Sequence, residues 1–139
     1  MENFHFSHTI RVRYSEIDGQ KIVFNAHYLT YIDIGFTEYM REILGPDWLT
    51  NQHSSQFEPV LVKSTVEYKK PALLDDLITI YVRVKKLGTS SLTLESIITR
   101  DDEILVEAET IQVNYNNVTK TSTPIPDDIK HRIQEFEAL

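Results

Sequence analysis

The sequence predicts an α+β fold in which one curled antiparallel sheet of five strands wraps around one long central helix. Three observations carry this prediction. Apolar residues recur at steps of three and four between residues 25 and 44, as they do on one face of a helix. Four later segments alternate apolar and polar residues, as half-buried strands do, and short turns join them. A helix with so wide an apolar face needs a sheet to cover it.

The chain opens with an alternating strand, a loop and the long helix. One face of the first strand is expected to hold Phe4, Phe6, His8, Ile10, Val12 and Tyr14. Residues 15–24 read as a loop with Gly19 as a turn residue and with Glu16 facing solvent. Asn25 suits the N-cap of the helix, and Gly45 followed by Pro46 suits its end. The helix should hold roughly 18 residues and measure about 27 Å.

Strands dominate the remainder of the chain. Residues 46–58 are expected to form a loop, with a short helical turn at 46–51. Strands are expected at 59–70, 77–87, 90–100 and 104–116, with hairpin turns near Gly88 and at Asp101-Asp102. The first of these should present one face made of Val60, Val62, Ser64, Val66 and Tyr68. A short helix at about 126–138 closes a single domain spanning residues 1–139.

Composition narrows the classes of function. The 139 residues carry a formal charge of −7 and no cysteine, which argues against nucleic acid as the main partner and excludes disulfides and cysteine chemistry. The five histidines have no ligand-like spacing, so no metal and no cofactor are expected. Neither a signal peptide nor a membrane span is apparent, and a cytoplasmic protein is expected. A local basic cluster either faces solvent or seats a small anionic ligand; it comprises Lys69, Lys70, Arg83, Lys85 and Lys86.

Two stretches near the N-terminus resemble a known family. "RYSEID" at 13–18 followed by "VFNAHYLTY" at 23–31 is similar to the start of the hotdog-fold acyl-CoA thioesterases of the 4-hydroxybenzoyl-CoA thioesterase-like superfamily. The resemblance extends over roughly residues 7–118. It implies a hotdog fold and hydrolysis of an acyl-CoA thioester. It also implies that Asp18 acts as nucleophile or general base, and that a backbone N–H near Asn25, at the start of the helix, holds the oxyanion.

The resemblance also suggests where the acyl-CoA substrate lies. The residues expected to contact it are Val23, Phe24, His27, Tyr28, Phe57, Val60 and Val62. The last three are included because, in relatives, their strand approaches the partner's active site across a dimer. One departure concerns Gln20 and Lys21, which stand where many relatives have glycine, and which would narrow or charge the mouth of the pocket.

Several alternatives stay open at this stage. Asn25 either caps the helix or also orients substrate, and His27 is either a first-turn surface residue or a proton relay. The carrier of the acyl group could be acyl carrier protein, although an acidic chain favours coenzyme A. A non-catalytic acyl-binding or sensing domain is the second reading, and a hydratase is less favoured because His27 lacks a partner acid. The unpaired sheet edge predicts a homodimer, with a tetramer as the favoured final assembly.

Overall fold

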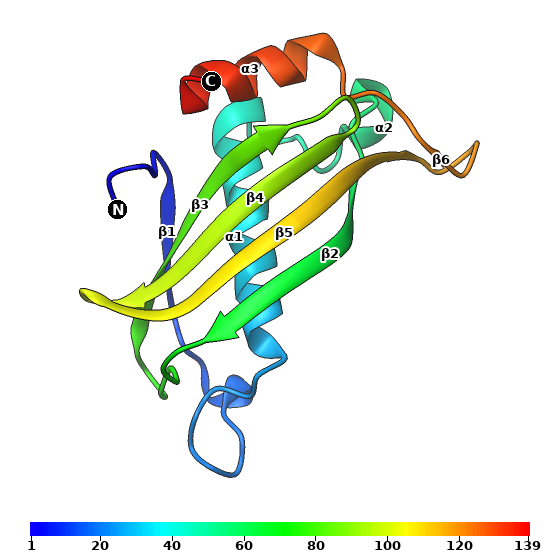
Figure 1. Cartoon of the computed structure of the whole chain (residues 1–139). Helices are drawn as coiled ribbons and strands as arrows, with labels where there is room; N and C mark the ends of the chain where they lie inside the picture. Colours follow the sequence, from blue (N-terminus) through cyan, green and yellow to red (C-terminus); the bar gives the residue numbers. More distant parts are fainter.

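The computed structural model describes residues 1–139, and it contains a curled antiparallel sheet wrapped around one long helix (Figure 1). The sheet has the strand order β1-β3-β4-β5-β2, and the short β6 pairs with the end of β5. The strands are β1 (Ser7–Arg11), β2 (Pro59–Tyr68), β3 (Leu77–Leu87), β4 (Ser91–Arg100), β5 (Glu103–Asn116) and β6 (Thr121–Ser122). The predicted five-stranded curled sheet is therefore confirmed, with β6 as an addition.

The central helix α1 (His27–Leu44) packs against the inner face of this sheet. Its apolar face is buried, as the period of three and four predicted. Gly35 allows the close approach, since a Cβ there would lie 2.6 Å from Cγ2 of Ile80 on β3. The helix ends at Gly45, which has φ +104° and donates its N–H to the carbonyl of Arg41. None of the helices combines the length and apolar composition that crossing a bilayer requires.

The last helix, α3 (Asp127–Glu137), docks on one end of α1. Ile129 and Ile133 on α3 are buried in the same hydrophobic cluster as α1 and the sheet. The carboxylate of Glu137 accepts a hydrogen bond from the hydroxyl of Tyr39 at 2.5 Å and another from the backbone N–H of Val84 at 2.9 Å. This carboxylate therefore joins α3, α1 and β3.

Local details differ from the sequence prediction at four places. Tyr14 is 83% exposed, because the chain leaves the sheet after β1 and forms a short 3-10 helix, η1 (Tyr14–Glu16). The N-cap of α1 is Ala26 and not Asn25. The short helix between α1 and β2 is α2 (Gln52–Ser55), after turns at 46–51.

The fourth difference is a β-bulge in β2. The register against β5 shifts between Leu61 and Lys63, so the expected single face is broken. Val60 pairs with the outward-facing Val113, whereas Ser64, Val66 and Tyr68 beyond the bulge lie on the side of α1. A bulge of this kind inserts one residue and cannot be read from the alternation alone, because every residue after it changes face.

Candidate active site

Glu16 is the buried centre of the loop that leads into α1. Only 3% of its surface is exposed, so the expectation that it faces solvent was wrong. Its carboxylate accepts the backbone N–H of Arg13 at 2.8 Å and the hydroxyl of Tyr31, on α1, at 2.8 Å. The Arg13 guanidinium adds two further bonds, at 2.7 and 3.0 Å. The three-residue spacing of Arg13 and Glu16 forms a capping box around η1, which is the sequence signal that was available for this contact.

This carboxylate is charged despite its burial. Burial alone acts to raise the pKa of Glu16, but the hydrogen bonds from the Arg13 N–H, the Tyr31 hydroxyl and the Arg13 guanidinium outweigh it and lower the pKa below its usual value. The pKa of Tyr31 is raised, first by burial and then by the hydrogen bond to Glu16. Tyr31 is therefore a neutral donor that ties the loop to α1.

Asp18 lies at the tip of a small hairpin. The hairpin follows Glu16, whose buried carboxylate ties this loop to α1. Ile17 and Val23 form an antiparallel bridge, and the N–H of Asp18 donates to the carbonyl of Ile22 at 2.9 Å. Oδ1 of the half-buried Asp18 accepts the N–H of Gln20 at 2.7 Å, whereas Oδ2 has no partner in the chain. The hairpin thus fixes the carboxylate by one oxygen and leaves the other without a partner in the chain.

Lys21 closes the same hairpin with an unusual backbone conformation. Its φ of 66° lies in the left-handed region, which glycine adopts at less cost. Its N–H donates to the carbonyl of Asp18 at 3.0 Å. Both Gln20 and Lys21 are exposed, so they lie at the rim of the hairpin beside the carboxylate.

The start of α1 offers free backbone donors. The N–H groups of Asn25 and Ala26 donate no hydrogen bond within the chain, and no side chain caps the helix. The next two N–H groups are engaged, since His27 donates to the carbonyl of Phe24 and Tyr28 to that of Asn25. Free N–H groups at the positive end of an 18-residue helix attract a partially negative oxygen.

The region between Asp18 and the free N–H groups of Asn25 and Ala26 is the mouth of the candidate site. Tyr28 lines this mouth from the first turn of α1. Its ring is buried against Tyr31 and Tyr68, with centroids 5.9 and 5.5 Å apart, and its hydroxyl accepts the N–H of Ala72 at 2.9 Å. Burial raises the pKa of Tyr28, and the negative charge of Asp18 adds to the rise. The phenol therefore stays neutral close to the carboxylate.

The other residues expected to bind substrate divide into two groups. Phe24 is half exposed beside the mouth, and the centroid of its ring lies 6.3 Å from that of the His27 ring. Phe57 is buried against Trp48, and Val23 is also buried, so both are core residues of the single chain. Their contact with substrate stays a prediction.

Val60 and Val62 are exposed, at 43% and 59%, near the far end of β2. They lie six to eight residues from Tyr68, which is roughly 20 to 26 Å of extended strand. One chain therefore does not bring them to Asp18.

The surface of the chain carries several hollows. None of five hollows is lined by Asp18, Asn25 or Tyr28. The largest of them, of about 530 Å³, lies between α2 and the β5–β6 turn at the opposite end of β2. None of these five hollows therefore encloses Asp18.

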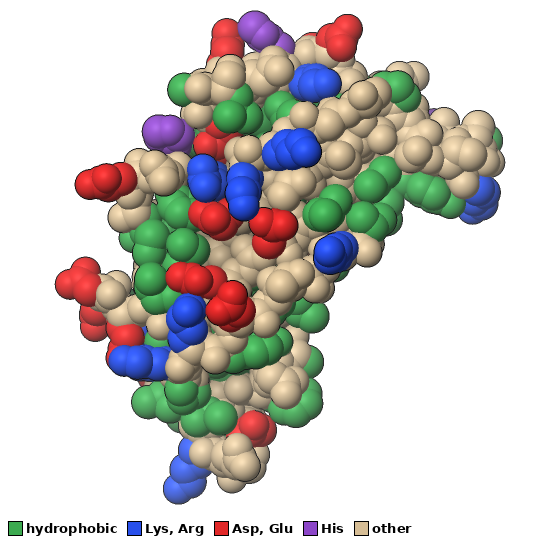
Figure 2. Space-filling model, viewed as in Figure 1, with side chains coloured by type: hydrophobic (Ala, Val, Ile, Leu, Met, Phe, Trp, Pro, Cys, Tyr) green, Lys and Arg blue, Asp and Glu red, His purple; other side chains and the backbone are tan.

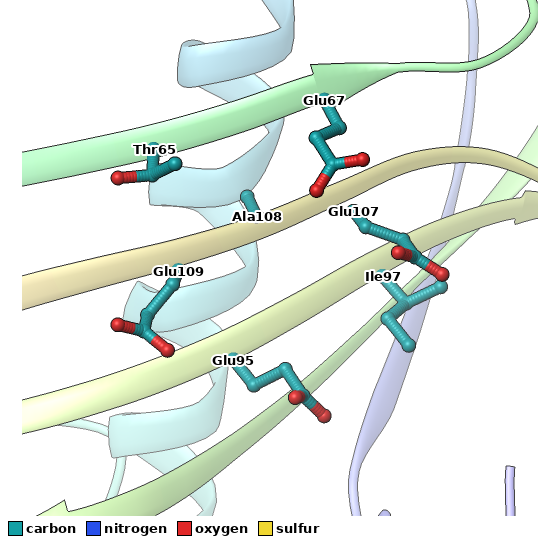
Figure 3. A pocket seen from close by; sticks show the side chains of 7 residues that line it. All are labelled: Thr65, Glu67, Glu95, Ile97, Glu107, Ala108 and Glu109. Carbon is teal, nitrogen blue, oxygen red and sulfur yellow. The ribbon is translucent and has the colours of Figure 1, made fainter.

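The outer face of the sheet carries another hollow, lined by four glutamates (Figure 3). Each of these glutamates lies within 4 Å of a lysine or arginine: Glu67–Lys69, Glu107–Lys69, Glu109–Lys85 and Glu95–Arg83. Figure 2 shows acidic and basic side chains side by side on this face. The predicted basic cluster is thus largely neutralised by acids, which favours the solvated strand face over a seat for an anion.

Comparison with known proteins finds thioesterases among the relatives of this chain. The model of the thioesterase superfamily matches residues 20–107, a range that includes Asn25 and begins just after Asp18. Among curated proteins, the acyl-CoA thioester hydrolase YbgC of Escherichia coli O6:H1 is 28% identical, covering 95% of this chain and 96% of its own. The long-chain acyl-CoA thioesterase FadM of Escherichia coli K12 is 30% identical, covering 91% and 96%.

Solved structures show the same architecture. A thioesterase from Thermus thermophilus, in complex with coenzyme A and zinc, superimposes with a TM-score of 0.86 at 29% identity, covering 100% of this chain and 98% of its own. The protein SAV2348 of Staphylococcus aureus, in complex with CoA, gives a TM-score of 0.87 at 18% identity, covering 96% and 84%. At that lower identity the second likeness concerns the fold alone.

Proposed function

The chain belongs to the thioesterase superfamily, and from this premise we propose that it hydrolyses an acyl-CoA thioester to a free carboxylic acid and CoA. Its curled sheet around α1 is the hotdog fold that the sequence resemblance implied. The names of YbgC and FadM, which match this chain over nine-tenths of its length or more, support acyl-CoA as the substrate class.

The observation that carries the proposal is a carboxylate with one unbonded oxygen on the hairpin that leads into the unbonded amides at the start of α1. Oδ2 of Asp18 is free, and the N–H groups of Asn25 and Ala26 have no partner. The thioester carbonyl oxygen accepts these N–H groups and is stabilised by them as negative charge develops. Losing one such donor typically costs roughly 3 kcal/mol of barrier.

Asp18 has two possible roles in this scheme. As a general base it takes a proton from water, whose hydroxide adds to the carbonyl carbon while the CoA thiolate leaves and is protonated. As a nucleophile it forms an acyl-aspartyl anhydride and expels the thiolate, after which water hydrolyses the anhydride. Both routes end in the same acid and thiol, and both need the free oxygen.

We propose that a second copy of the chain completes the mouth. The edge of β2 beyond β5 is unpaired, and it exposes Val60, Leu61 and Val62. A two-fold axis near the middle of β2 would place the first residues of one strand beside Tyr68 of the other. The partner's Val60 and Val62, and its hollow between α2 and the β5–β6 turn, would then face Asp18.

Two further expectations belong to this proposal. Residues 1–139 act as one domain, which is supported by the single hydrophobic cluster that α3 shares with the sheet and α1. The tetrameric assembly and the cytoplasmic location stay predictions.

The test is turnover of an acyl-CoA panel, followed by a thiol-detecting dye, in wild type, Asp18→Asn and Asp18→Ala. The matched control is Asp102→Asn, which changes an exposed acid in the β4–β5 turn. We expect kcat to fall by a factor of about 100 or more in both Asp18 variants and to stay unchanged in the control. Equal rates for all four proteins would refute a role for Asp18, and acyl-CoA binding without turnover in wild type would favour the non-catalytic reading.

A further inference from the structure

Glu16 joins three segments of the chain at the base of the mouth. Its backbone carbonyl accepts the N–H of Phe24 at 2.9 Å, and its carboxylate accepts the hydroxyl of Tyr31 at 2.8 Å. Glu16 lies two residues before Asp18, and Phe24 lies one residue before Asn25. One residue therefore links the segment that carries the carboxylate, the segment that carries the free amides, and α1 itself.

Tyr31 supplies the bond between this loop and the helix. No other side chain of α1 forms a hydrogen bond with residues 13–24. Both groups are closed off from solvent, since Tyr31 is 0% and Glu16 is 3% exposed. Water cannot readily replace a bond in so enclosed a position, so its loss leaves the loop less firmly held.

The hairpin is also held by main-chain contacts with the segment that follows β2. Ile22 bridges Leu73, and the N–H of Val23 donates to the carbonyl of Ala72 at 2.9 Å. These contacts remain when the hydroxyl of Tyr31 is removed. Loss of that hydroxyl should therefore let the hairpin shift relative to α1 without unfolding it.

We propose that Glu16 and Tyr31 are positioning residues for thioester hydrolysis, because their bond sets where the Asp18 carboxylate lies relative to the free N–H groups before α1. This inference rests on the proposed thioesterase function and adds two residues that act on the reacting groups without touching substrate. A shift of about 1 Å between reacting groups can lower a rate by about 100-fold. Loss of the bond should lower kcat and not raise KM, because it displaces the reacting groups and leaves the substrate contacts in place.

The experiment compares Tyr31→Phe with the matched control Tyr39→Phe in the full chain. Each variant removes one buried hydroxyl of α1 that donates to a glutamate, Glu16 in the first case and Glu137 in the second. The first bond lies toward the end of α1 that the loop enters, and the second toward the end that α3 covers (Figure 1). For the acyl-CoA that wild type hydrolyses fastest, we expect Tyr31→Phe to lower kcat about tenfold or more with little change in KM. Tyr39→Phe should change neither constant.

Variants of Glu16 test the same bond from its other end. Glu16→Gln keeps an oxygen at Oε1, the atom that accepts the Tyr31 hydroxyl and the Arg13 N–H, whereas Glu16→Ala removes it. We expect Glu16→Gln to keep most of the wild-type kcat at pH 7 and 25 °C, and Glu16→Ala to lose kcat as Tyr31→Phe does. Equal kcat in the two Glu16 variants would overturn the inference. If Glu16→Ala fails to fold, the comparison of Tyr31→Phe with Tyr39→Phe decides.

The outcomes separate this inference from the proposed function. If Asp18→Asn loses turnover while Tyr31→Phe and Tyr39→Phe retain equal kcat, the inference is overturned and the enzyme remains a thioesterase. If wild type hydrolyses no acyl-CoA, the proposed function fails, and amide hydrogen exchange then tests whether the bond positions the hairpin. The N–H groups of Asp18 and Phe24 are bonded within the hairpin and should exchange about tenfold faster in Tyr31→Phe than in Tyr39→Phe. Equal exchange rates in these two variants would overturn the inference in that case.

Discussion

Replacing Glu16 by glutamine should destabilise the protein by an amount that depends on pH. The carboxylate accepts four hydrogen bonds, three from Arg13 and one from Tyr31. A glutamine amide keeps one acceptor oxygen and turns two N–H donors toward donors of Arg13. The remaining bonds to the Arg13 N–H and Tyr31 lose the charge that strengthens them.

The expected loss of unfolding free energy follows from the contribution of each hydrogen bond. A hydrogen bond to a charged group contributes about 1 kcal/mol more than a neutral one, so two weakened bonds cost about 2 kcal/mol. The lost pair with the guanidinium adds little, because the Arg13 side chain is 70% exposed. We therefore expect Glu16→Gln to lower the free energy of unfolding by about 2 to 3 kcal/mol near pH 7.

The sign of the pH dependence is set by the lowered pKa of Glu16. A carboxyl with a folded-state pKa below its usual value near 4.5 stabilises the fold above that value, and the contribution is lost as pH falls through the folded-state pKa. The difference between wild type and Glu16→Gln should thus shrink on acidification below about pH 4.5. Glutamine does not titrate, so it cannot show the same loss.

Urea unfolding at fixed protein concentration measures this difference, with the fluorescence of the single, buried Trp48 as the signal. Glu38→Gln is the control, because Glu38 forms a partly exposed pair with Arg41 at the same three-residue spacing. That control should change stability by less than about 1 kcal/mol. A Glu16→Gln effect as small as the control, or one that does not vary with pH, would contradict the buried-anchor explanation.

Two more stability predictions follow from close contacts of α1. Gly35→Ala should cost about 1 to 3 kcal/mol of unfolding free energy, because the new methyl would overlap β3, whereas Gly19→Ala, with no atom within 4 Å, should change it by less than about 0.5 kcal/mol. Equal melting curves for the two variants would contradict the close packing of α1 against β3. Tyr39→Phe should cost about 1 to 2 kcal/mol by removing the donor to Glu137, and a thermal melt no lower than that of wild type would disprove the contribution of this bond.

The sequence predicted the elements well because their signals are local and periodic. The step of three and four located α1 to within two residues of its start, and alternation located the four long strands. The burial of Glu16 escaped prediction because its partner Tyr31 is 15 residues away, on another element. Resemblance suggested Asp18, but only the fold reveals that one carboxylate oxygen is held and the other free.

Other features of the site depend on more than one strand or more than one chain. The bulge in β2 changes which residues face α1, and no local pattern marks the inserted residue. Thr110 and Gln112 are buried polar residues of β5 that read in sequence as ordinary strand alternation. The wall opposite Asp18, in the dimer we propose, belongs to another molecule, which a single sequence does not display.

The carboxylate of Glu137 makes the interior of the protein depend on its last helical turn. Tyr39 is synthesised 98 residues before the acceptor that its buried hydroxyl needs. Any polypeptide that stops short of this turn, through a premature stop codon or proteolytic trimming, leaves that phenol and the Val84 amide unsatisfied in the interior. Copies shortened before Glu137 should therefore be less stable and more readily cleared by cellular proteases.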